Sequence, residues 1–133
     1  MQTLVEMLED WPSLERLAEM AQQGVPRGFV NDLAEALFLP VNKLAPLVHM
    51  SPRTLRRYQP VQVLPFEASE RALLVARILM RAITVLGSQQ KAVHWLTNRN
   101  GALGAAPLKH MDTVFGIERV EQILMCIEHG VYS

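Results

Sequence analysis

Helical periodicity is the feature that most constrains how this chain can fold. Apolar residues recur every three to four positions in each long segment, and no segment alternates apolar and polar residues over the length of a strand. The chain has 133 residues, of which 50% are hydrophobic, so it can bury a substantial core. The sequence therefore predicts an all-α fold.

Capping residues and helix breakers divide the chain into predicted helices. Ser51 followed by Pro52 is the sharpest start, because a serine side chain accepts from free backbone N–H groups and a proline in the first turn loses no hydrogen bond. Gly24, Gly87 and Gly130 are the corresponding stops. The expected helices cover residues 13–23, 29–39, 41–48, 52–58, 67–86, 88–96 and 112–130, with a brief helical turn at 107–111.

Two prolines mark the expected division of the chain. Pro60 and Pro65 flank an apolar segment, and X-Pro steps favour extended backbone. We therefore expect a helix-turn-helix lobe over residues 1–62 and a smaller helical lobe for partner binding over residues 63–133.

The longest predicted helix, residues 67–86, carries an unusually broad apolar stripe. Such a surface needs cover on more than one side, so the helix is either central to its lobe or half of a homodimer interface. The residues expected at a dimer interface are Leu79, Ile83 and Leu86.

A helix-turn-helix is predicted between residues 44 and 57, where a short turn separates a helix from the Ser51-capped segment. The formal net charge of the chain is zero, yet residues 43–58 contain four basic residues and no acid. Hydroxyl and guanidinium groups bind phosphates and base edges, although arginines on a short helix can also be a solvated surface. The candidate DNA-binding residues are Ser51, Arg53, Thr54, Arg56 and Arg57.

Two residues in this motif indicate weakened DNA binding. His49 occupies the turn position where left-handed backbone is expected and where glycine has no steric cost. Pro46 lies in the preceding helix and removes a backbone hydrogen bond unless it falls in the first turn. We expect the lobe to keep its fold with reduced affinity for DNA.

The sequence contains no catalytic or metal-binding constellation that favours an enzyme. The histidines are scattered and lack ligand spacing, and Cys126 with His129 is better explained as a packed thiol beside a helix C-terminus. We expect no catalysis, no cofactor and no metal. No run approaches the roughly 18 apolar residues of a membrane helix, and no signal-peptide pattern follows Met1, so we expect a cytoplasmic protein without a membrane partner.

Short motifs follow one another through the C-terminal half of the chain. They are Ala92-x-x-Trp95-Leu96, Ala102-Leu103-Gly104, Pro107-Leu108, Asp112-Thr113-x-x-Gly116, Val120 and Glu128-His129-Gly130-Val131-Tyr132. In this order the chain resembles the Xre/MbcA/ParS-type antitoxins of RES-domain toxin-antitoxin systems, closely over residues 67–133 and moderately over 44–58. The resemblance implies a homodimer that silences a NAD-consuming RES-domain toxin and commonly represses its own operon.

The C-terminal tail is the expected inhibitory segment. A tail released by a glycine can reach into a partner's pocket, where a buried tyrosine is a typical hot spot. The expected toxin-binding residues are Glu128, His129, Gly130, Val131, Tyr132 and Ser133. The expected partners are a cognate RES-domain toxin, operator DNA and a second copy of the chain; the alternative function is a helix-turn-helix transcriptional repressor without a toxin partner.

Overall fold

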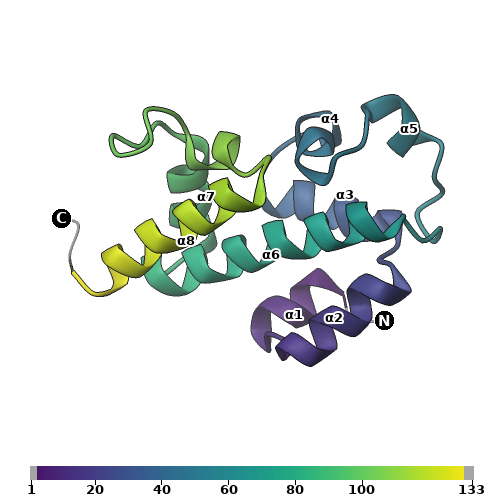
Figure 1. Cartoon of the computed structure of the whole chain (residues 1–133), viewed down its shortest axis with the longest axis horizontal. Helices are drawn as coiled ribbons and strands as arrows, with labels where there is room; N and C mark the ends of the chain where they lie inside the picture. The colour runs from purple at the N-terminus through teal and green to yellow at the C-terminus, as the bar shows by residue number, and fades with distance from the viewer. Residues whose placement is uncertain (1–2, 131–133) are drawn as a thin grey trace. The chain divides into compact units, whose positions relative to one another are not determined.

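The computed structural model describes residues 3–130, and its architecture is helical (Figure 1). Within these residues there are eight α-helices, two short 3-10 helices and no β-strand, which confirms the predicted all-α fold. The chain divides into two compact units, Met1–Ala76 (unit 1) and Arg77–Ser133 (unit 2). The division falls inside helix α6, Phe66–Leu86. The predicted lobe boundary at residues 62/63 stays a prediction.

Unit 1 contains five short α-helices, one 3-10 helix and the first half of α6. They are α1 (Leu4–Glu9), α2 (Leu14–Gln23), α3 (Arg27–Ala36), α4 (Val41–Leu44), η1 (Ala45–Val48) and α5 (Pro52–Arg56). Helix α1 was not predicted. It is stabilised by a capping box, in which the Thr3 side chain accepts from the Glu6 backbone N–H and the Glu6 carboxylate accepts from the Thr3 N–H.

The predicted single helix over residues 41–48 is instead an α-helical turn followed by a 3-10 helix. Pro46 explains the change, because it cannot donate the hydrogen bond that would continue α4. It lies in the first turn of η1, where no intrahelical partner is lost. The proline is thus accommodated by a change of helix type at Ala45.

The predicted linker between α5 and α6 is held against the residues at the start of α3 and just before it. The backbone N–H of Arg27 donates to the Gln62 carbonyl oxygen at 2.8 Å, and that of Leu64 donates to the Val25 carbonyl oxygen at 2.9 Å. Buried Ser69 on α6 joins both sides, since its Oγ accepts from the Val25 N–H and donates to the Leu64 carbonyl oxygen. The segment therefore fixes the path of the chain from α5 into α6.

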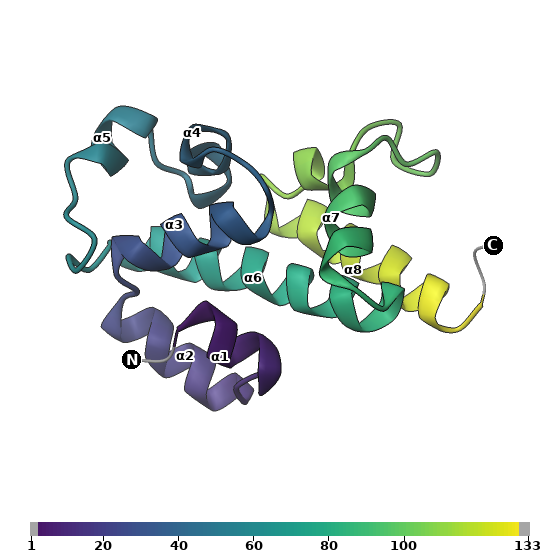
Figure 2. The same ribbon diagram turned by 180° about the vertical axis from the view of Figure 1, so that it is seen from behind.

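Unit 2 contains the second half of α6, then α7 (Gln89–Thr97), η2 (Pro107–His110) and α8 (Val114–Glu128). These elements agree with the predicted ranges to within one or two residues. Figures 1 and 2 show α7 and α8 beside the end of α6. An ion pair of 2.7 Å between Arg77 on α6 and Glu121 on α8 supports that packing.

No single helix among the described residues is long and apolar enough to cross a membrane. Helices α6 and α7 satisfy that criterion of length and composition only as a pair, across a bend of 116°.

Candidate functional surfaces

The turn before α5 has the left-handed backbone that the sequence predicted. His49 adopts φ 59° and ψ 38°, and its N–H donates to the Pro46 carbonyl oxygen at 3.1 Å. Helix α6 supports the turn: buried Arg71 donates from Nε to the Leu47 carbonyl oxygen at 2.8 Å, and Glu67 lies 3.5 Å from His49 Nδ1. The position of α5 is therefore set by contacts from a long helix of the same unit.

Helix α5 is anchored by one side chain and capped by another. Leu55 is completely buried beneath it. Ser51 Oγ accepts the Thr54 backbone N–H at 3.0 Å and also lies 2.9 Å from Thr54 Oγ1. Both hydroxyl-bearing residues are exposed, so the cap that starts the helix is also part of its outer surface.

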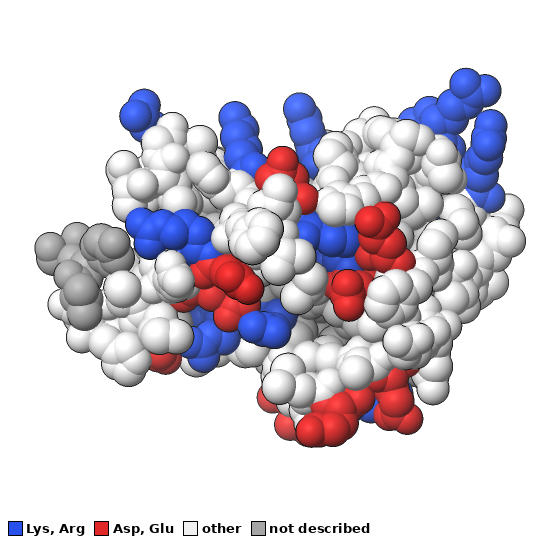
Figure 3. Space-filling view, in the orientation of Figure 1, with Lys and Arg blue, Asp and Glu red and all other residues white. Residues whose placement is uncertain are grey.

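Three arginines occupy the rest of that outer surface, as the sequence predicted. Arg53, Arg56 and Arg57 are exposed, and within the described part of the chain their guanidinium groups have no acidic partner. Figure 3 shows basic side chains projecting over α5 with no acidic side chain beside them, whereas acidic side chains gather over α1 and α2. The structure thus brings the five predicted DNA-binding residues together on α5 and its two cap residues, Ser51 and Arg57.

The predicted toxin-binding residues begin at the last turn of α8. Glu128 Oε1 lies 3.6 Å from Arg81 Nη2 on α6 and 4.0 Å from His129 Nε2. Gly130 ends the helix with φ +73°, and all three of the described tail residues are exposed. Val131, Tyr132 and Ser133 lie outside the described residues.

The three predicted dimer residues differ in exposure. Leu79 is completely buried within its own chain, so it offers no surface to a second copy. Ile83 and Leu86 are half-buried and stay candidates for a dimer contact.

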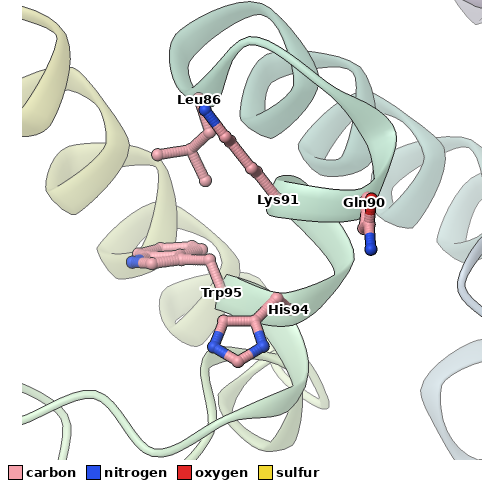
Figure 4. A pocket seen from close by; sticks show the side chains of 5 residues that line it. All are labelled: Leu86, Gln90, Lys91, His94 and Trp95. Atoms are coloured by element: carbon pink, nitrogen blue, oxygen red, sulfur yellow. The ribbon is translucent and has the colours of Figure 1, made fainter.

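Sequence reasoning missed a hollow at the corner between α6 and α7 (Figure 4). It is open, has a volume of about 480 Å³, and is lined by Leu86, Gln90, Lys91, His94 and Trp95. The signal was present as helical spacing, because positions 90 and 94, like 91 and 95, lie one turn apart on α7. Taken one at a time, the lining residues predicted only a tryptophan in the core and a helix exposed to solvent.

The described residues contain no group of three or more His, Cys, Asp or Glu side chains that could hold a metal ion. The thiol of Cys126 is free and half-buried.

Two family models match the chain in succession. The model described as the antitoxin Xre-like helix-turn-helix domain matches residues 16–77, which include all five predicted DNA-binding residues. The model described as the antitoxin Xre/MbcA/ParS C-terminal toxin-binding domain matches residues 81–130, which include the hollow and the described part of the tail. No curated protein matches the sequence.

Proposed function

Because this chain belongs to the Xre/MbcA/ParS-type antitoxins, we propose that it neutralises a RES-domain toxin that consumes NAD and represses the operon that encodes both. The observation that carries the proposal is the order of the two matched domains, a DNA-binding type followed by a toxin-binding type in one chain. Because both domains belong to one chain, toxin binding can change how well the antitoxin binds its operator. The amount of free toxin can in this way control transcription of the operon.

The α5 surface supports the DNA-binding part of the proposal. Arg53, Arg56 and Arg57 can each meet a phosphate or the O6 and N7 atoms of a guanine. Ser51 and Thr54 lie on the same exposed turn. We propose that α5 enters the major groove of operator DNA, with a small contact area because the helix spans only Pro52–Arg56.

The end of α8 supports the toxin-binding part. The helix stops at an exposed glycine, so the residues from Glu128 onward can enter a pocket of the partner without loss of core packing. We propose that this tail covers the NAD site of the toxin, and that two copies of the chain pair through half-buried Ile83. An operon repressor and a NAD-consuming toxin both act where DNA and NAD are present, so we place the protein in the cytoplasm.

The matched domains are of a regulatory type, and we propose that the chain has no catalytic activity of its own. Cys126 and His129 are one turn apart, but among the described residues no hydrogen bond joins the thiol to the imidazole, as a nucleophile and its base require. When the purified protein is incubated with NAD, the NAD should remain intact.

The experiment that tests the function is a titration of the RES-domain toxin encoded beside this chain. NAD consumption should fall to zero as purified antitoxin is added and should stay there beyond a fixed stoichiometry. Undiminished NAD consumption at excess antitoxin, combined with binding to the promoter, would favour the transcriptional repressor without a toxin partner. The exposed arginines of α5 are the observation that favours this alternative function.

A further inference from the structure

The hollow on unit 2 combines an apolar floor with a basic rim. Leu86 and Trp95 are both half-buried, and Figure 4 shows them on one side of the corner, with the Lys91 side chain extending back toward Leu86. Because the hollow is open, a small molecule in it would remain largely in water. Its geometry suits a side chain that projects from a protein surface.

The rim carries two groups that favour a carboxylate. Lys91 is exposed and has no acidic partner among the described contacts, and no acidic residue lines the hollow. His94 is oriented by Asn98, whose amide Nδ2 donates to the His94 carbonyl oxygen at 2.7 Å and lies 3.3 Å from His94 Nδ1. The contact with Asn98 occupies His94 Nδ1 and leaves the other ring nitrogen, Nε2, for another partner.

We propose that this hollow is an anchor site for the toxin, which inserts an apolar or aromatic side chain next to an aspartate or glutamate. The inference rests on the proposed function and specifies it, because all five lining residues fall within the stretch matched by the toxin-binding domain. The apolar side chain fills the floor formed by Leu86 and Trp95. The carboxylate meets Lys91 and His94, which leaves the tail free to act at the active site.

Lys91→Glu is the decisive variant, because it reverses the charge of the rim without harming the fold. Lys91 is the third residue of α7, and its backbone N–H already donates to the cap residue Ser88. A glutamate there completes a capping box, which stabilises the helix start. Weaker binding by this variant therefore cannot be attributed to unfolding.

The measurement is calorimetric titration of the neighbouring RES-domain toxin with the full chain at low and high salt. Lys91→Glu should weaken binding by about tenfold at low salt, and by less at high salt, because attraction is replaced by repulsion. Lys91→Arg keeps the charge and should bind as the wild type does. The matched control is Lys109→Glu, which makes the same charge change on an exposed residue of η2 outside the hollow and should leave affinity unchanged.

The outcomes separate this inference from the proposed function. If the wild-type chain does not bind the toxin, the proposed function is wrong. If the wild type binds and Lys91→Glu binds equally well, the anchor site is wrong while the function stands. If light scattering shows that Lys91→Glu changes the mass of the free chain and toxin affinity is unaltered, the hollow is an interface between two copies, which also overturns the anchor site.

Discussion

At the scale of single residues, two residues of unit 1 other than glycine adopt the left-handed backbone conformation that glycine adopts more easily. His49 and Phe38 have φ values of 59° and 57°. His49 could be anticipated, because it stands at the turn of a helix-turn-helix and histidine tolerates this conformation. Phe38 could not, since phenylalanine is not a turn residue. It ends α3 in a Schellman motif, in which the Leu39 N–H donates to the Ala34 carbonyl oxygen at 2.9 Å and the Phe38 N–H donates to that of Glu35 at 3.0 Å.

Replacing Phe38 by glycine should stabilise the chain. Left-handed backbone costs a residue with a Cβ about 1–2 kcal/mol, and the added freedom of glycine in the unfolded state offsets about half of that gain. Phe38 is 63% exposed, so little burial is lost. In urea unfolding, the free energy of unfolding of Phe38→Gly should exceed that of Phe38→Ala by about 0.5–1 kcal/mol. Phe38→Ala is the control, because it removes the same ring but keeps the Cβ. Equal stability of the two variants would mean that the backbone at this position is not strained.

Gly116 should be intolerant of substitution because η2 packs directly on the first turn of α8. A Cβ at this position would overlap the carbonyl oxygen of His110 and lie 2.7 Å from its carbonyl carbon. We expect Gly116→Ala to lower the free energy of unfolding by about 2–3 kcal/mol, since backbone rather than a flexible side chain must move. A Cβ added at Gly101 would meet no atom within 4 Å, so Gly101→Ala is the control and should change stability by less than about 0.5 kcal/mol. Similar unfolding curves for both variants would contradict the close packing.

At the scale of elements, the helices whose ends carry local signals could be predicted from the sequence. Ser13, Ser51, Ser88 and Thr113 each cap the helix predicted to follow them, by accepting the backbone N–H three residues later. These interactions depend on residues close in sequence, which is why pattern reasoning finds them. Helix α1 was not predicted because six residues are too few to establish a periodic apolar stripe.

Elements that depend on distant partners could not be predicted in the same way. The segment before α6 reads as a linker, yet its path is fixed by backbone bonds from Arg27 to Gln62 and from Leu64 to Val25. Nearly every residue has a backbone donor and acceptor, so no pattern of side chains predicts which backbone groups of distant segments will pair. The hollow on α7 was missed for a related reason, because Leu86 belongs to a different helix from its other lining residues.

Helix α5 should depend strongly on its cap. With only five residues it has no stability of its own, and Ser51 Oγ satisfies the Thr54 N–H at 3.0 Å. Ser51→Ala should lower the free energy of unfolding by about 1 kcal/mol and weaken operator binding as well. Ser13→Ala removes the equivalent cap of α2 and is the matched control: a similar loss of stability is expected, with operator binding retained. Equal losses of DNA binding in both variants would show that general destabilisation, rather than the α5 surface, is responsible.

At the scale of the whole molecule, a net charge of zero conceals an uneven distribution. On the face of unit 1 shown in Figure 3, basic side chains project over α5 with no acidic side chain beside them, whereas the largest group of acidic side chains lies over α1 and α2. Such a separation orients the unit toward a polyanion, since the acidic side is repelled and the basic side attracted. Net charge alone would have argued against a DNA partner.

The charge distribution predicts how DNA binding responds to salt. If Arg56 contacts a phosphate, Arg56→Ala should reduce the slope of log K against log salt by about one unit; if it contacts a guanine, the variant should lose about 1–3 kcal/mol with relaxed sequence preference. Gel shifts on the chain's own promoter measure both effects. Arg99→Ala is the control, because Arg99 is also exposed but lies outside the matched helix-turn-helix domain. Salt-insensitive, unchanged binding by a variant lacking Arg53, Arg56 and Arg57 would place DNA binding on another surface.

The final prediction separates affinity from inhibition within the toxin complex. Deleting residues 129–133 removes the proposed plug of the NAD site but leaves the hollow and the Arg81–Glu128 contact in place. The truncated chain should still bind the toxin in a pull-down, while NAD consumption should resume, because the surfaces that hold the complex together lie on the helices. Tyr132→Ala should reproduce part of the loss, since truncation of a buried aromatic anchor costs on the order of 2 kcal/mol. Lys91→Glu is the complementary control, with weakened binding but full inhibition once the complex is saturated. If the truncated chain silences the toxin at the same stoichiometry as the intact chain, the inhibitory surface must lie on the loop over residues 98–106 or on the helices themselves.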